Sequence, residues 1–217
     1  MAEANSTDLL MKFMRSPGSH IVGESTTDIS TLGKNNPLLM DFKPGFMFEI
    51  SRFTFKAGTS PNEATTPQAN NQQQQGKNKA SAASIGQSGG YKSWRSGKST
   101  TYPVDLQPVS ITRPIDISSP ILMQDCIDCI SYDSATLIKR KSAGTDSAGE
   151  VFLRVDFVGV LIIGIDWSND DEVEEDCQFI CRSVTISYRP QLPDGRLGAT
   201  KSGFWSMVPG ETQVVLK

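Results

Sequence analysis

The sequence has only one histidine, His20, in 217 residues, and this scarcity excludes most histidine-based chemistry. A Ser-His-Asp triad, a histidine zinc site or a histidine proton shuttle would each have to use that one side chain. The Walker A, HExxH and GxGxxG motifs are absent as well. His20 follows a Pro-Gly-Ser stretch, and we interpret it as a turn or strand residue. The sequence therefore predicts that the protein is not an enzyme.

Long uncharged apolar runs are also missing. The most apolar segment, 151–165, still contains Arg154 and Asp156, so no membrane insertion is predicted. The first eight residues carry neither a basic region nor a cleavage motif, which predicts a cytoplasmic chain made without a signal peptide. With 21 basic and 24 acidic residues, the chain as a whole lacks the polybasic character of nucleic-acid-binding proteins.

Four cysteines are too few for a disulfide scaffold, and their spacing leaves two interpretations open. Cys126 and Cys129 form a CxxC pair and Cys177 and Cys181 a CxxxC pair, so four thiolates could bind zinc. The favoured alternative is buried thiols, because the first pair falls on the apolar stripe of a predicted helix, where cysteine acts as a small hydrophobe. No metal and no cofactor are predicted.

Seven carboxylates crowd into residues 166–176. Their order does not match an EF-hand loop, and the glycine that such a loop needs is missing, which argues against a calcium site. We interpret the segment as a solvated charged turn between two strands. Alternatively, its charge could complement a basic surface on a neighbouring subunit.

The composition changes sharply over residues 57–101, which include an Asn/Gln run at 70–75 and only one large aliphatic residue, Ile85. Such a stretch cannot bury enough apolar surface to offset its ordering entropy. We therefore predict one domain, residues 1–217, that contains a low-complexity and disordered loop insertion at 57–101. Tyr91, Trp94 and the basic residues near them could bind single-stranded nucleic acid, but we favour a solubilising tether.

The rest of the chain is predicted to be mainly strands, and the clearest is the aromatic run 46–55. Phe48 and Ile50 share one parity, whereas Phe53 and Phe55 share the other, which predicts a bulge near residues 51–52 and places Arg52 and Thr54 on the outer face. The other predicted strands are 8–14, 104–112, 135–141, 151–165, 177–188, 203–208 and 213–216.

One helix is predicted after Ser118-Ser119-Pro120, where serine can cap and proline can open the first turn. Residues 121–130 then place Leu122, Cys126, Cys129 and Ile130 on one stripe. The predicted fold class is mainly β: a two-sheet β-barrel or sandwich with one short α-helix and the long loop insertion.

Several blocks, in the same order, resemble the haemolysin-coregulated protein (Hcp) family of the bacterial type VI secretion system. They are an opening strand at 7–13 with the Gly-Glu-Ser turn, the aromatic strand 49–55, the strand-to-helix block 111–122, the Tyr-x-Pro-Gln turn, and the closing strand around 203–205. The family signature residues are Gly23, Glu24, Ser25, Asp116, Ser119, Pro120, Leu122, Tyr188, Pro190 and Gln191.

Three features depart from the family pattern. Residues 30–44 are longer than the usual segment after the Gly-Glu-Ser turn and contain no histidine. The insertion at 57–101 exceeds the usual glycine-rich loop, and little sequence follows the closing strand. The last feature favours a plain tube component over a fusion with an effector.

The resemblance implies a structural protein of the secretion tube that forms homohexameric rings, which stack into a tube. It also implies a spike protein, a contractile sheath and effector proteins as partners, and secretion through the apparatus to the outside or into a target cell. Arg52 and Thr54 are predicted to face the lumen, on strand alternation alone. Two alternatives stay open: a monomeric β-sandwich binding module that uses the long loop, and a phage tail-tube-like protein.

Overall fold

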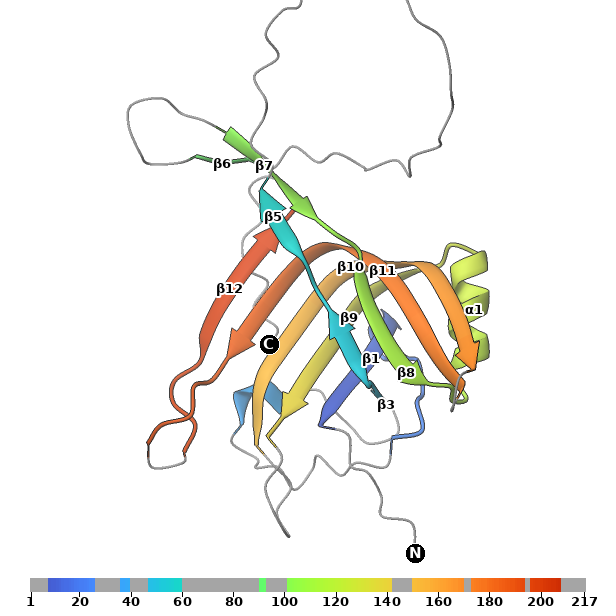
Figure 1. Ribbon diagram of the computed structural model, residues 1–217, viewed down its shortest axis with the longest axis horizontal. Coiled ribbons are helices and arrows are strands. Elements are labelled where there is room, and N and C mark those ends of the chain that lie inside the picture. Colours follow the sequence, from blue (N-terminus) through green and yellow to red (C-terminus); the bar gives the residue numbers. More distant parts are fainter. Residues whose placement is uncertain are drawn as a thin grey trace, which may run out of the picture. The chain divides into compact units, whose positions relative to one another are not determined.

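The computed structural model describes residues 8–25, 36–39, 47–59, 90–92, 101–141, 150–169, 173–193 and 196–207 (Figure 1). Its contacts divide the chain into two units. The first comprises Met1–Phe55 and Pro108–Lys217, and the second comprises Lys56–Gln107.

The first unit is built on one large antiparallel sheet that is not closed into a barrel. Its strands are β1 (Leu9–Ser16), β2 (Ser19–His20), β3 (Phe48–Glu49), β4 (Arg52–Thr54), β8 (Val109–Pro114), β9 (Ser131–Arg140), β10 (Val151–Asn169), β11 (Val173–Tyr188) and β12 (Lys201–Ser206). They follow the order β2-β1-β9-β10-β11-β8-β4, with β12 on β11 and β3 on β1. The prediction of a mainly β fold with one α-helix is confirmed for the described residues.

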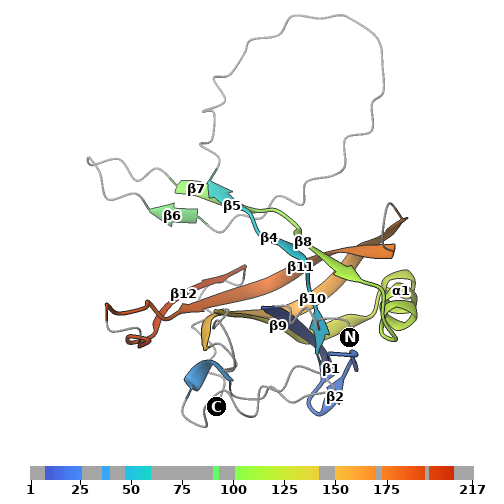
Figure 2. The same ribbon diagram turned by 60° about the horizontal axis from the view of Figure 1, so that its bottom comes forward.

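The long strands β10 and β11 pair along most of their length and curve together through the middle of this sheet (Figure 2). The first part of β11 pairs with β8, from Glu174 opposite Pro114 to Phe179 opposite Val109. Its last part pairs with β12, ending with Tyr188 opposite Lys201. β8 and β12 therefore pair with opposite ends of β11.

The aromatic segment 48–54 changes its pairing partner half-way. Phe48 lies opposite Met11 on β1, and Arg52 lies opposite Thr112 on β8. Between them the Ile50 N–H donates to the Leu9 carbonyl at 3.0 Å and the Ser51 N–H to the Thr112 carbonyl at 2.9 Å. The break between β3 and β4 thus falls where the parity switch in the sequence predicts a bulge.

Aromatic rings fill the space on one face of the sheet. Phe13 contacts Phe48, Tyr132 and Phe179 at centroid distances of 5.6, 5.1 and 5.8 Å, and all four are buried. Phe157 extends the cluster to Phe179 at 5.2 Å. Burying an aromatic or large aliphatic side chain contributes about 1.5–3 kcal/mol, so these buried rings together stabilise the sheet strongly.

A smaller apolar cluster lies on the opposite face of β1 and β9. Leu10 and Ile138 are in register there and pack with Met47, Val151 and Leu38. Leu38 belongs to the short 3-10 helix η1 (Pro37–Leu39), whose first turn is fixed by an Asn36 side chain that accepts from the Leu38 N–H. Both faces of this part of the sheet are therefore covered.

The helix α1 (Ser119–Ile127) begins where the sequence predicts and ends earlier. Its buried side chains are Ser119, Leu122 and Asp125. Cys129 follows the helix with φ of 54° and is exposed, and Ile130 is 40% exposed, so the predicted stripe of Leu122, Cys126, Cys129 and Ile130 is wrong beyond Cys126. The positive φ at Cys129 turns the chain out of the helix, which moves both side chains off the buried face.

Asp125 fixes the helix to the sheet. Its carboxylate accepts hydrogen bonds from Arg15 on β1 and from the Tyr132 hydroxyl on β9. Burial, and then the hydrogen bond to this carboxylate, raise the pKa of Tyr132 above its ordinary value. The hydroxyl therefore keeps its proton and serves as a permanent donor.

The second unit contains a three-stranded sheet. Its strands are β5 (Ala57–Thr59), β7 (Thr101–Leu106) and β6 (Gly90–Lys92), in that order. The strand predicted over 104–112 is thus divided between β7 and β8, with Pro108 between them. Residues 60–89 and 93–100 lie outside the described residues, so the disordered insertion and the single domain stay predictions; the same holds for the strand at 213–216.

Candidate interaction site around Arg113

A completely buried arginine, Arg113 on β8, organises the junction between strand and helix. Its Nε donates to Glu175 Oε1 at 2.7 Å, and neither side chain has any exposed surface. Its other nitrogens donate to Ser118 Oγ at 2.8 Å and Ser119 Oγ at 2.9 Å. The guanidinium also lies 4.6 Å from the centre of the Phe48 ring. A buried charge is tolerated only with such a full set of partners.

Asp116 is the second carboxylate that binds this guanidinium. Its Oδ1 lies 2.9 Å from Arg113 Nη1 and accepts from the Ser118 N–H at 2.8 Å and from the Ser118 hydroxyl. Burial alone would raise the pKa of Asp116, but the bonds from Ser118 and the charge of Arg113 outweigh it and hold that pKa below its ordinary value. The carboxylate is therefore charged at neutral pH.

The Gly-Glu-Ser turn joins the same junction from the other end of the sequence. The Glu24 N–H donates to Asp116 Oδ2 at 3.3 Å, and Glu24 Oε1 accepts from the Ile117 N–H at 3.2 Å. Gly23 allows this approach, since a Cβ there would lie 2.0 Å from the Met47 carbonyl oxygen. The Ser25 N–H then donates to that carbonyl at 3.2 Å. Two sequence blocks about 90 residues apart are thus joined by hydrogen bonds.

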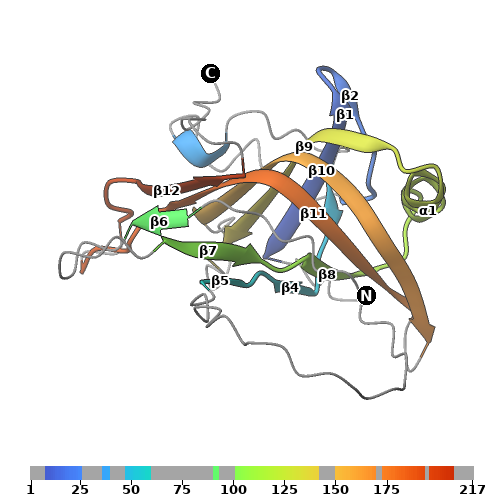
Figure 3. The ribbon, with the colours of Figure 1, turned by 90° about the horizontal axis from the view of Figure 1, so that it is seen from above.

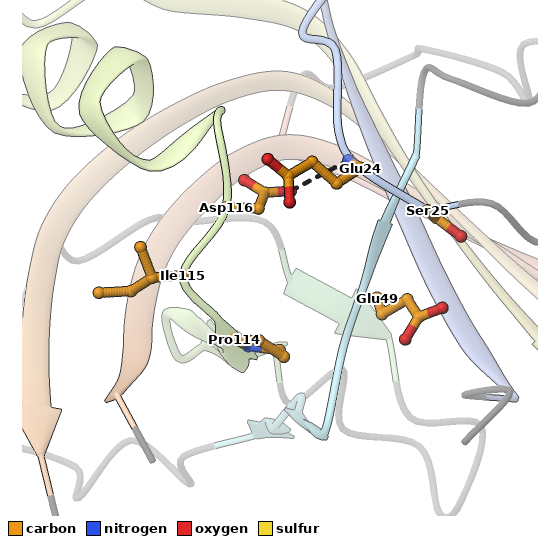
Figure 4. A pocket seen from close by; sticks show the side chains of 6 residues that line it. All are labelled: Glu24, Ser25, Glu49, Pro114, Ile115 and Asp116. Atoms are coloured by element: carbon orange, nitrogen blue, oxygen red, sulfur yellow. Dashed lines mark hydrogen bonds between the residues drawn. The ribbon is translucent and has the colours of Figure 1, made fainter. Parts of the chain in front are cut away.

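A pocket of about 220 Å³ opens beside this contact (Figure 4). It is lined by Glu24, Ser25, Glu49, Pro114, Ile115 and Asp116. Figure 4 shows the Glu24 and Asp116 carboxylates side by side, on different segments of the chain. Three of the six lining residues are acidic, so the pocket suits a cationic group better than an anion.

The signature residues Pro120 and Leu122 lie in α1, and the last three signature residues surround the turn after β11. Tyr188 ends the strand and packs edge-on against Phe152 at 6.1 Å. The Pro190 carbonyl accepts from the Gly198 N–H at 2.7 Å, and Gln191 bridges to Leu197. Arg189 donates from Nε to the Gly198 carbonyl at 3.1 Å. These contacts within the chain are sufficient to explain why the turn contains these signature residues.

Arg52 and Thr54 lie on β4, away from that turn. They are in register with Thr112 and Ser110 on β8, which in turn pair with Asp176 and Gln178 on β11. Phe53 packs its ring against Phe157 at 6.4 Å, so the two polar side chains belong to the opposite face. Their polar neighbours make this face a hydrophilic stripe across three strands.

The thiols do not gather into a ligand set. Cys177 and Cys181 are buried, whereas Cys129 is exposed. Burial raises the pKa of both Cys177 and Cys181 to about 12. Within the part of the chain that the structure describes, no group of three or more His, Cys, Asp or Glu side chains could hold a metal ion. The acidic segment 166–176 lies partly outside that part.

One further serine motif is visible in the sequence: Gly-Gln-Ser-Gly-Gly at 86–90 fits the pattern of hydrolase nucleophiles. That motif requires a preceding buried strand, and the low-complexity sequence around it offers no apolar run of that kind. Residues 86–89 lie outside the described residues, and Gly90 begins β6. No role is assigned to it.

Sequence reasoning missed the central role of Arg113 and its partner Glu175. A signal was present, because a charged residue inside an apolar strand pattern needs a buried counter-charge. The partner could not be chosen, since Glu175 is one of many adjacent acids. Trp167 also binds Glu175, because its indole N–H donates to Glu175 Oε2 at 2.9 Å, but only the folded structure reveals this contact.

Comparison with known proteins identifies the family. The model of the family "Type VI secretion system effector, Hcp" matches residues 49–190, which include β8, α1 and the residues around Arg113 except Phe48 and the Gly-Glu-Ser turn. The chain belongs to the Hcp family. Hcp proteins are tube proteins of the type VI secretion system and are not an enzyme family.

Individual relatives agree with this membership. Protein hcp1 of Pseudomonas aeruginosa is 30% identical over 93 residues, which are 42% of this chain and 57% of that protein. The matched segment thus spans little more than half of the relative. The chain also shares its fold with a solved type six secretion system protein (TM-score 0.59, 18% identity, 93% of this chain and 96% of the other). Hcp1 from Salmonella typhimurium has a TM-score of 0.53 and 15% identity to this chain, and the match covers 92% of this chain and 94% of the other.

Among the described residues, no helix is long and apolar enough to span a membrane.

Proposed function

We propose that the chain is a structural subunit of the type VI secretion inner tube, that it forms hexameric rings, and that stacked rings carry effector proteins and are secreted with them. Its partners in this role are other copies of itself, the spike protein, the contractile sheath and the effectors. The observation that carries the proposal is the family match over 49–190, which includes most of the large sheet.

The sheet topology supports self-assembly. Among the described residues, β12 pairs only with β11, which leaves the other edge of β12 without a strand. Exposed strand edges attract another strand unless they are covered, and a closed ring removes them. A hexamer that covers this edge would account for an edge strand with the exposed sequence Lys-Ser-Gly at 201–203.

The polar stripe of β4, β8 and β11 is the proposed lumen wall. It contains Arg52 and Thr54 together with Ser110 and Gln178, and none of these side chains is large and apolar. A wall of hydroxyl, amide and isolated charged groups binds no single partner tightly, so cargo of different sequences can pass. Thr54→Trp would narrow the lumen and reduce effector loading while ring formation continues.

The first experiment is the solution mass of the purified chain by light scattering, with negative-stain images of the same peak. Six times the 23.6 kDa chain mass and ring-shaped particles are expected. A monomer at all micromolar concentrations would contradict the proposal. Deletion of residues 60–100 would then distinguish a ring blocked by the insertion from a monomeric binding module, because only the former would assemble after the deletion.

A further inference from the structure

Figure 3 shows that β10 and β11 form a long hairpin with well separated ends. The described residues at these two ends carry opposite charge. At the base, Lys139 lies opposite Leu153, and Lys201 lies opposite Tyr188. The exposed or half-buried basic residues described at this end are Lys139, Lys141, Arg189, Arg196 and Lys201. The acids among the described residues there are Glu150 and Asp8, and Asp8 pairs with the buried Arg140. The described residues of the base therefore have a positive net charge.

The turn end of the hairpin is acidic. Asp166 is exposed, and Glu174 and Asp176 are half-buried. Because Glu174 pairs with Pro114, the pocket lined by Glu24, Glu49 and Asp116 adjoins this end and adds three carboxylates. Arg52 lies two strands from Asp176 and contributes one positive charge, so the net charge of this end is still negative.

Both ends also expose large apolar side chains. Trp167 and Val173 are each 47% exposed at the turn end. Tyr188 and Leu192 are 45% and 43% exposed at the base. Exposed apolar groups surrounded by charges of one sign are typical of interaction surfaces. The two surfaces are complementary in charge and share the same apolar character.

We infer that the acidic turn end of one copy docks on the basic base of a second copy, with a lysine or arginine of the base entering the acidic pocket. This inference rests on the proposed ring. Edge-to-edge pairing of strands joins neighbouring copies in the direction perpendicular to the strands. The two charged surfaces instead lie at opposite ends of the strands. The contact therefore joins successive rings, and because it is head-to-tail it propagates into a tube.

Two charge-reversed proteins test the inference. In the turn variant, Asp166→Lys and Glu174→Lys remove most of the negative charge of the turn end; in the base variant, Lys139→Glu and Lys201→Glu remove the positive charge of the base. Each variant alone should form rings that no longer stack, because every contact then lacks one of the two complementary charges. An equal mixture of the two preassembled rings should form pairs of rings, since the unaltered base of the turn variant meets the unaltered turn end of the base variant.

The control is Asp128→Lys with Asp133→Lys, two exposed carboxylates outside both surfaces, which changes the charge as much as the turn variant does. It should stack like the wild type. Ring mass is measured by light scattering and stack length in negative-stain images at low and high salt. Variant rings that stack alone as the wild type does, or a mixture that forms no pairs of rings, would overturn the inference and leave the ring intact. Absence of wild-type rings would refute the proposed function itself.

Discussion

Arg113 and Glu175 face each other across β8 and β11 with 2.7 Å between Nε and Oε1 and no exposed surface on either side chain. The pair connects the end of the large sheet to the start of α1, because the same guanidinium holds Ser118 and Ser119. The position of this ion pair therefore fixes the direction in which α1 leaves the sheet.

Replacement of Arg113 by leucine should destabilise the protein by about 3–5 kcal/mol, because the Glu175 charge would be buried without a counter-charge. Urea unfolding followed by tryptophan fluorescence measures the change. The double variant Arg113→Leu with Glu175→Leu should recover part of the loss, because it removes the fully buried unpaired carboxylate and leaves only Asp116 without its cation. A double variant that is less stable than Arg113→Leu alone would contradict this explanation.

Gly23→Ala should cost about 1–3 kcal/mol, since the new Cβ would lie 2.0 Å from the Met47 carbonyl oxygen and backbone would have to move. Gly203→Ala is the matched control, because nothing lies within 4 Å of a Cβ there. The two free energies of unfolding are compared under the same conditions. Equal stability of both variants would show that the Gly-Glu-Ser turn is less constrained than its geometry implies.

Acid should weaken the strand-to-helix junction through Asp116. The folded state lowers the pKa of this carboxyl below its ordinary value of 3.8, so the stabilisation is fully present above that pH. It is lost as the pH falls further, through the folded pKa. Asp116→Asn should therefore lower stability at pH 7 and flatten the stability curve below about pH 4. A curve parallel to that of the wild type would count against the ion pair.

Alkylation should distinguish the four thiols. At pH 8, Cys177 and Cys181 are protonated as well as buried, because their pKa is raised to about 12. Iodoacetamide should modify the exposed Cys129 in the folded protein and reach Cys177 and Cys181 only in urea. Intact mass counts the adducts. Protection of all four thiols, lifted by a chelator, would instead indicate a zinc site.

Much of the first unit could be predicted from the sequence, because strand parity and helix-start signals are local. The switch between Ile50 and Phe53 marked the bulge, and Ser118 with Pro120 marked the start of α1. The end of α1 could not be predicted, since Cys129 and the apolar Ile130 continue the helical pattern of the sequence although the chain turns away at Cys129.

The candidate site was harder to predict, because it depends on pairing between distant segments. The resemblance selected Glu24 and Asp116 as separate signature residues, and only the fold brings them into contact. The partner of Arg113 required the register of β8 on β11, which places Arg113 opposite Glu175. No local pattern contains that register.

The connection of β4 to β8 through the whole second unit has a consequence for folding. The two strands are neighbours, with Thr54 opposite Ser110, yet Lys56–Gln107 lies between them in the chain. The entropy cost of closing such a loop grows only with the logarithm of its length, by about 0.6 kcal/mol for each doubling. The Gln107 N–H bond to the Lys56 carbonyl, at 3.0 Å, also closes the loop at its root. Insertions of very different length can therefore be exchanged here with little effect on the stability of the sheet.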